Sequence, residues 1–486
     1  KNLFGLDIDE RAAQLTSFAL MMKGRGDDRR LFERGIQLNV MALVNSDGLD
    51  VEGLANSVNL ADHGLKLADI LELKQLFEHA TIFGSLIQLP DGLSDKLPAL
   101  RRLSELMGQD MLAGEALKTM EPLLRQAELL AARYDDVVAN PPYMGSGGMN
   151  ALLKDFTKYT YPEAKRDLFA CFMERNHSLS HNHGIIAMVT MQSWMFLASF
   201  QRMRARLLRD QTIISMAHIG FNSFPTLNSK VALATAFVCQ NARIEGYEGI
   251  YIDLNSASQT ADKRQVFINR DASINFETSA EKLQMLPGSP IAYWASDQVR
   301  KVFNQHRPLS ESLEAREGLT TGSNDLFVRI WHEADHENIT FNLPAGLSTR
   351  GIRSKWFPYL KGGGFRRWAG FNENIVSWSN DGEEVMAFKD IRTGRVRSHN
   401  YNGEFAFRPG LTWTGIGIVF AIRIAPSGFM FDTKAPMAFS SSAHQDLSIA
   451  AFLNSCVSAH FLGLLAPTLD FKIGHILNLP LVPQEH

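Results

Sequence analysis

Cysteine is scarce in this 486-residue chain, and its scarcity excludes disulfide-stapled and cysteine-rich zinc proteins. The only three cysteines, Cys171, Cys239 and Cys456, lie far apart, and no C-x-x-C spacing occurs. We expect buried apolar thiols in a reducing compartment, and therefore a cytoplasmic protein. No metal site is predicted, because the histidines that stand out also lack metal-ligand spacing: His218, His444, His460 and His475.

A long apolar run and an excess of charge of one sign are also missing. The longest apolar run, Gly184 to Phe200, is interrupted by polar residues and is short for a bilayer span. A buried strand followed by a helix fits it better, so no membrane association is predicted. Lys plus Arg number 49 and Asp plus Glu number 52, which gives a net charge of −3. This balance excludes a protein that is basic throughout, but it allows a local basic surface that binds nucleic acid.

Strands alternate with helices in the first half of the chain. Apolar runs predict strands at 2–8, 134–139, 184–190, 212–218 and 231–239, and helical periodicity predicts helices at 10–23, 163–180 and 196–209. This alternation predicts an α/β fold with a parallel-type, doubly wound sheet and helices on both faces over residues 1–243. We place a connecting segment at 244–309 and a mixed, β-rich domain at 310–486, where helical periodicity fades.

One motif carries chemistry, and it follows the predicted strand 134–139. Asn140-Pro141-Pro142-Tyr143 leaves the carboxyl end of that strand, where open α/β sheets bind their ligands. The Asn140 side chain and the Pro141 carbonyl offer two acceptors that can orient an exocyclic amine toward an electrophile. Tyr143 can stack on an extruded base, a contact worth about 1–3 kcal/mol. The alternative is a structural Pro-Pro turn.

The tetrapeptide is similar to motif IV of N6-adenine DNA methyltransferases. Three segments in order, NLFGLDIDERAAQLTSFALMMKGR, VVANPPYMGSGGMN and HIGFNSFPTLNSKVALATAFV, resemble the PglX-type adenine-specific methyltransferases of BREX phage-defence systems. The resemblance runs through nearly the whole chain. It implies a Rossmann-like methyltransferase domain, S-adenosylmethionine as cofactor, double-stranded DNA as substrate and other BREX components as partners.

The resemblance also implies roles for three further residues. Asp7 in GLDID takes the place of the acid that binds the ribose hydroxyls of the cofactor, whereas Asp9 is expected to start a helix. Ser85 stands where the family has an Asp near the cofactor adenine, and Phe224 takes the place of an aromatic that packs on the flipped base. The alternative for Phe224 is an ordinary core residue. The family's Gly-rich cofactor loop precedes the ribose-binding acid. Only six residues precede Asp7 here, so we expect a fragment that lacks the first strand and loop and is inactive alone.

The second predicted domain is basic around Gly-rich turns. Residues 350–424 hold twelve Lys or Arg against six Asp or Glu, and they include Trp356, Trp368, Trp378 and Trp413. By resemblance this is a DNA target-recognition domain, in which Arg and Lys contact phosphates or guanine. The predicted DNA-binding residues are Arg350, Arg353, Lys355, Lys361, Arg366, Arg367, Arg392, Arg395 and Arg397. The alternative for each of them is a solvated charged surface.

Two other functions stay open at the level of sequence. The same site geometry could methylate another planar nitrogen, such as an RNA adenine or a protein glutamine. A non-catalytic DNA-binding or assembly module of the same defence complex is the other alternative, because the Gly-rich cofactor loop is absent from this sequence.

Overall fold

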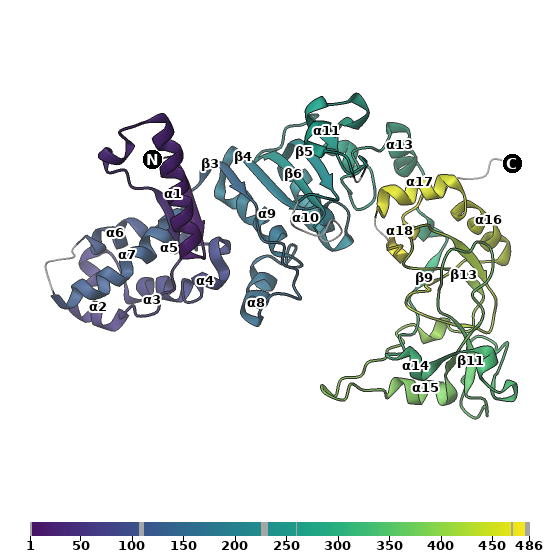
Figure 1. The fold of residues 1–486 in the computed structure, drawn as a ribbon. Coiled ribbons are helices and arrows are strands. Elements are labelled where there is room, and N and C mark those ends of the chain that lie inside the picture. The colour runs from purple at the N-terminus through teal and green to yellow at the C-terminus, as the bar shows by residue number, and fades with distance from the viewer. Residues whose placement is uncertain (1, 106–110, 225–231, 259, 468–469, 482–486) are drawn as a thin grey trace. The chain divides into compact units, whose positions relative to one another are not determined.

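The computed structural model describes residues 2–105, 111–224, 232–258, 260–467 and 470–481 (Figure 1). The chain forms two compact units. The first comprises 1–194 and 206–277, and the second comprises 195–205 and 278–486. The fold is mixed α/β with several separate sheets, and each unit has its own hydrophobic core.

The first unit begins with a small parallel sheet followed by a helical region. Strand β1 (Phe4–Asp7) pairs with β2 (Asn39–Ala42), and α1 (Glu10–Asp27) connects them. The helices that follow enclose a core of buried aliphatic residues and Phe77. They are α2 (Val51–Ser57), α3 (Leu67–Leu76), α4 (Ala80–Phe83), α5 (Asp91–Ser94), α6 (Leu97–Ser104) and α7 (Met111–Ala131).

The apolar stripe of α1 is exposed rather than packed. Leu15, Phe18 and Met22 are 68%, 63% and 51% exposed, and Ala13 is the buried residue of this helix. The expected start of the helix is confirmed, because Asp9 is its N-cap and accepts a hydrogen bond from the amide of Arg11.

A six-stranded sheet forms the rest of the first unit, in the order β3-β4-β6-β5-β7-β8. Figure 1 shows β4, β6 and β5 side by side. The strands are β3 (Tyr134–Ala139), β4 (Ser180–Met191), β5 (Thr212–Gly220), β6 (Ala234–Gln240), β7 (Glu248–Asp253) and β8 (Asn275–Ser279). Helices α8 (Ala151–Thr160), α9 (Leu168–Leu179) and α11 (Lys263–Asn269) accompany them, and α10 (Gln201–Asp210) belongs to the first unit from residue 206 on.

The prediction of a parallel-type sheet is only partly right. Strand β3 runs parallel to β4, and β5 runs parallel to β7. Strand β6 runs antiparallel to both β4 and β5. The reason is its connection: no crossover helix lies between β5 and β6 in the described residues, and parallel neighbours need such a crossover.

Two four-stranded sheets and a helical cluster make up the second unit. The sheet orders are β14-β13-β16-β9 and β10-β12-β11-β15. The strands are β9 (Glu314–Arg316), β10 (Val328–Ile330), β11 (Trp356–Leu360), β12 (Asn374–Ser377), β13 (Gly410–Trp413), β14 (Ile422–Ala425), β15 (Met430–Phe431) and β16 (Met437–Phe439). The helices are α12 (Ala280–Gln284), α13 (Asp297–Gln305), α14 (Asn324–Phe327), α15 (Ser379–Met386), α16 (Ala443–Leu453), α17 (Cys456–Leu465) and α18 (Ile473–Leu477).

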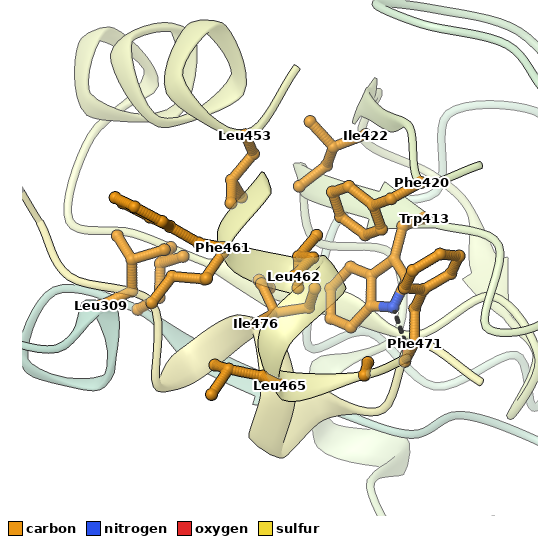
Figure 2. Packing of buried hydrophobic residues seen from close by; sticks show 14 of the residues in the cluster. Leu309, Trp413, Phe420, Ile422, Leu453, Phe461, Leu462, Leu465, Phe471 and Ile476 are labelled. Carbon is orange, nitrogen blue, oxygen red and sulfur yellow. Dashed lines mark hydrogen bonds between the residues drawn. The ribbon is translucent and has the colours of Figure 1, made fainter. Parts of the chain in front are cut away.

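The core of the second unit packs the C-terminal helices against the β13–β14 hairpin (Figure 2). Trp413 is fully buried, and its indole nitrogen donates to the carbonyl of Phe471 at 2.9 Å. The stretch 443–465 forms two helices, α16 and α17. Asn454 separates them and hydrogen-bonds the backbone of Ile422 in both directions.

None of the described helices is by itself long and apolar enough to cross a membrane. The pair α16 and α17 meets the length and composition of a span together, but the two helices are bent by 72°. Both contribute buried side chains to the core in Figure 2.

Candidate functional site

Asn140 lies directly beyond the last residue of β3, as predicted. Strand β3 is parallel to β4, so the carboxyl ends of two strands meet here. Asn140 is exposed, and its side chain makes no hydrogen bond with any described residue, whereas Pro141 is buried. The buried proline fixes the turn, and the amide next to it stays available to a ligand.

The loop after the motif is tied to the start of α9. The amide of Leu168 donates to the carbonyl of Met144 at 3.0 Å, and that of Ser146 donates to Arg166 at 2.9 Å. Asp167 is the N-cap of α9, and burial raises the pKa of its carboxyl group above the usual value. These contacts fix the backbone on the C-terminal side of Tyr143.

Tyr143 and Phe224 come together although 81 positions separate them in the sequence. Their ring centroids are 6.1 Å apart, and the ring planes are tilted by 56°. Phe169 of α9 contacts Tyr143 edge-on at 6.3 Å. The Tyr143 hydroxyl is buried and has no hydrogen-bond partner among the described residues. Burial also raises the pKa of this phenol, so it stays neutral at ordinary pH.

Phe224 is carried by a turn that several groups hold in place. The Lys263 ammonium of α11 donates to the carbonyls of Ile219 and Phe221. Ser223 donates to the carbonyl of Gly220 and accepts from the amide of Ala234, so it joins the ends of β5 and β6.

The glycine in this turn is required at its position. Gly220 has φ +65°, and a Cβ there would lie 1.8 Å from the side-chain oxygen of Asn255. Sequence reasoning missed Lys263, and no local pattern indicates it. Pro225, which follows Phe224 in the predicted motif, lies outside the described residues.

Asp7 and Ser85 occupy neighbouring segments. Asp7 ends β1, is exposed, and accepts a hydrogen bond from the amide of Asp9 through one carboxylate oxygen at 2.9 Å. Ser85 lies in a 3₁₀ turn (Gly84–Leu86) that contacts β1. A Cβ on Gly84 would approach Ile8 to 3.1 Å, so a glycine lets the two segments lie close.

Residues around Ser85 connect that turn to α8 and α9. The Arg175 guanidinium donates to the carbonyls of Ser85 and Leu130, at 2.8 and 2.9 Å. Phe83, next to the turn, stacks on Phe156 of α8 with centroids 4.2 Å apart. The loop that carries Asn140 continues into α8, so this stack joins the Ser85 region to the Asn140 region.

A buried histidine lies at the carboxyl end of β5. His218 shares a 2.7 Å hydrogen bond with Gln192, which directly follows β4. Burial lowers the pKa of His218 to about 4, with Asp253 raising it and Lys263 lowering it. His218 is therefore neutral near pH 7.

The predicted DNA-binding residues fall in three separate segments of the second unit: 350–355, 361–367 and 392–397. Arg350 pairs with Asp381 at 3.2 Å, and Lys355 pairs with Glu384 at 3.3 Å. Six of the other predicted residues are exposed: Arg353, Arg366, Arg367, Arg392, Arg395 and Arg397. Lys361 is half-buried.

The tryptophans and the cysteines noted in the sequence differ in their burial. The tryptophans near these residues do not form an exposed set, because Trp378 and Trp413 are core residues and Trp356 is half-buried. Trp368 alone among the four is 53% exposed. Of the three cysteines, Cys171 and Cys239 are buried as expected, but Cys456 is exposed at the start of α17.

Within the described ranges, no group of three or more His, Cys, Asp or Glu residues is arranged to hold a metal ion.

Residues 1–224 match the family model of the Eco57I restriction-modification methylases. The chain is 40% identical over 497 residues to an adenine-specific methyltransferase PglX of Lacticaseibacillus casei (strain Zhang). It is 36% identical over 513 residues to an adenine-specific methyltransferase BrxX of Escherichia coli O9:H4 (strain HS). Over its whole length the chain is thus similar to proteins named adenine-specific methyltransferases. The resemblance predicted from the sequence is thus confirmed.

Both alignments include 100% of this chain and 41% of the relative, so the chain spans about two fifths of the PglX and BrxX proteins. Among solved structures, the type IIL restriction-modification enzyme MmeI in complex with DNA is similar, with a TM-score of 0.47 and 11% identity. That match covers 71% of this chain and 46% of MmeI.

Proposed function

We propose that this chain is the catalytic and target-recognition portion of a DNA adenine N6-methyltransferase of a BREX-type phage-defence system. The observation that carries the proposal is the position of Asn140. Its side-chain amide, which has no hydrogen-bond partner among the described residues, lies at the end of a sheet strand, three residues before an aromatic ring that contacts a second ring. The similarity to adenine-specific methyltransferases supports the same assignment.

The chain's own residues would hold and orient the target adenine. The Asn140 side-chain oxygen and the Pro141 carbonyl would accept the two protons of the exocyclic amine and direct its lone pair away from the ring plane. Because the rings of Tyr143 and Phe224 are tilted by 56°, a flat base can lie face-on against only one of them. We assign face-on stacking to Tyr143 and an edge contact to Phe224.

Residues of this chain also suit part of a cofactor site. S-adenosylmethionine, when bound, supplies an activated methyl group to the amine nitrogen. The second carboxylate oxygen of Asp7 would accept the ribose hydroxyls, since the first is occupied by the amide of Asp9. Ser85, beside it, would line the adenine pocket. The amine can release its proton to water after the transfer, so no buried base is required.

The two predicted domains take the corresponding roles in this proposal. Residues 1–243 would form the doubly wound, Rossmann-like catalytic domain, and 244–309 would connect it to 310–486 while adding β7 and β8 to its sheet. The last segment is the target-recognition domain, whose exposed arginines would contact double-stranded DNA. Other components of the defence system would bind the complete protein.

Replacing Asn140 in the full-length protein tests the proposal. Asn140→Ala should abolish adenine methylation, by a factor of at least about 100, because the amine loses a preorganised acceptor. DNA binding should change less than about twofold, since no charge is lost. Asn304→Ala, an exposed asparagine on α13, is the matched control and should retain normal methylation. Near-normal methylation by Asn140→Ala would refute the assignment.

A further inference from the structure

One arginine of the second unit is buried, and no acidic side chain in the described part of the chain forms an ion pair with it. Arg423 on β14 is 1% exposed, and its Nε has no hydrogen-bond partner among the described residues. Its other guanidinium nitrogens make only long contacts, at 3.5 Å to the carbonyl of Arg366 and 3.4 Å to the Thr414 hydroxyl. Burial lowers the pKa of Arg423 to about 10, and the positive charge of Arg366 adds to the effect. A buried charge that is neither paired with an acid nor fully hydrogen-bonded destabilises the fold.

Arg204 of the same unit shows how a structural buried arginine is satisfied. It is also 1% exposed. Its guanidinium donates to three backbone carbonyls at 2.7, 2.8 and 3.1 Å, those of Gly288, Leu197 and Ser289. The residues that the structure describes offer Arg423 no such set of acceptors, so their packing does not account for its charge.

The loop at 361–372 brings a second guanidinium to the same place. Arg366 lies 4.6 Å and Arg423 lies 4.9 Å from the ring centroid of Phe371. Contact with an aromatic ring favours each cation, but it neutralises neither. Arg366 is exposed, so the charge pair is accessible from its side.

Two glycines are required for this arrangement. A Cβ on Gly363 would lie 2.6 Å from the Phe371 ring, and one on Gly370 would lie 2.3 Å from Arg366. Trp368 pins the loop to β14: its amide donates to the carbonyl of Ile422, and its carbonyl accepts from the amide of Ile424. The two glycines and these hydrogen bonds therefore hold the loop in a conformation that keeps Arg366 close to Arg423. The Trp368 side chain in this loop is 53% exposed.

We propose that Arg366 and Arg423, held around Phe371 by the 361–372 loop, form a binding site for a phosphate of the DNA backbone. Arg366 makes the direct contact, and the uncompensated charge of Arg423 strengthens the positive potential there, because low-dielectric surroundings screen it poorly. A phosphate diester supplies the negative charge that no described side chain supplies. The identity of the ligand rests on the proposed DNA substrate.

Arg423→Met in the full-length protein tests this site. DNA affinity is measured by titration of a mixed-sequence duplex at several salt concentrations without cofactor, and stability by thermal unfolding. We expect the variant to be as stable as the wild type or more stable, since an uncompensated buried charge is removed. Its DNA affinity should fall roughly tenfold at low salt, and the slope of log K against log salt should become shallower by about one.

Matched variants keep the test decisive. Arg307→Met removes an 82%-exposed arginine from the same unit and should leave the salt slope unchanged. Arg366→Ala, an exposed substitution that does not threaten folding, should reproduce the loss seen with Arg423→Met. An unaltered slope in Arg366→Ala, or a destabilised Arg423→Met with normal DNA binding, would overturn the site. The titration measures DNA binding alone. A failure to detect adenine methylation in a separate assay would therefore count against the proposed enzyme activity and not against this phosphate site.

Discussion

Replacing Tyr143 separates the role of its ring from that of its hydroxyl. The hydroxyl is buried and unpartnered among the described residues, so it contributes no hydrogen bond to the fold. An unsatisfied buried polar group costs about 1–3 kcal/mol. Tyr143→Phe removes this group and keeps the ring, so its free energy of unfolding should equal that of the wild type or exceed it by about 1 kcal/mol.

Tyr143→Ala removes the ring and should be damaging in two ways. Loss of stacking on the base is worth about 1–3 kcal/mol, which corresponds to about a 5- to 150-fold lower kcat/KM for methylation. Loss of the ring contacts with Phe169 and Phe224 should lower stability by roughly 0.5–1.5 kcal/mol for each pair. Tyr143→Phe and Tyr143→Trp should both methylate far better than Tyr143→Ala.

Single-turnover methylation of a duplex containing the target adenine is the assay, with unfolding in denaturant measured in parallel. Tyr159→Ala on α8, where the ring is 78% exposed, is the control for removing a tyrosine. A mismatch opposite the adenine lowers the cost of extrusion and should partly rescue Tyr143→Ala. If Phe and Trp were as poor as Ala, the hydroxyl would be the functional group and the stacking role would be wrong.

Two further predictions concern the turn that carries Phe224 and the buried histidine beside it. Lys263→Met removes both hydrogen bonds to the turn and should lower kcat/KM about tenfold, with DNA affinity retained; Arg264→Met, its exposed neighbour, should have no effect in the same methylation assay. The folded-state pKa of His218 is about 4, below the usual 6.5, so its contribution to stability is present above pH 6.5 and is lost as pH falls toward 4. Denaturant unfolding should show about 2 kcal/mol lost between pH 7 and pH 5 through this group, and His218→Gln should remove that loss.

Local patterns predicted the position of the Asn140 motif in the fold well. Alternating and apolar runs located β3, β4 and β5. A strand that buries one face shows alternating apolar residues, and one that buries both faces shows a continuous apolar run, so both signals are local. The Asn140 tetrapeptide could then be placed at a strand end. The direction of β6 could not be predicted in this way, because it depends on how the chain returns between β5 and β6.

Contacts between distant residues account for what the sequence reading missed. Lys263 acts on carbonyls more than 40 positions earlier, and Arg423 lies beside an arginine 57 positions away. Arg423 did leave a signal, since it is the single charge in the apolar run 416–425. The burial of the tryptophans also depends on distant residues, because the sheets that bury them pair strands that are far apart in the sequence.

The spacing between Tyr143 and Phe224 is set by two independent backbone anchors. Hydrogen bonds between 144–146 and 166–168 hold the first ring, and Lys263 with Ser223 holds the second. Neither anchor uses a group that would touch the base. Substitutions in the anchors should therefore change how well an adenine is positioned without altering the groups that contact it. Such variants would lower kcat and leave DNA affinity intact, which distinguishes a positioning defect from a loss of DNA binding.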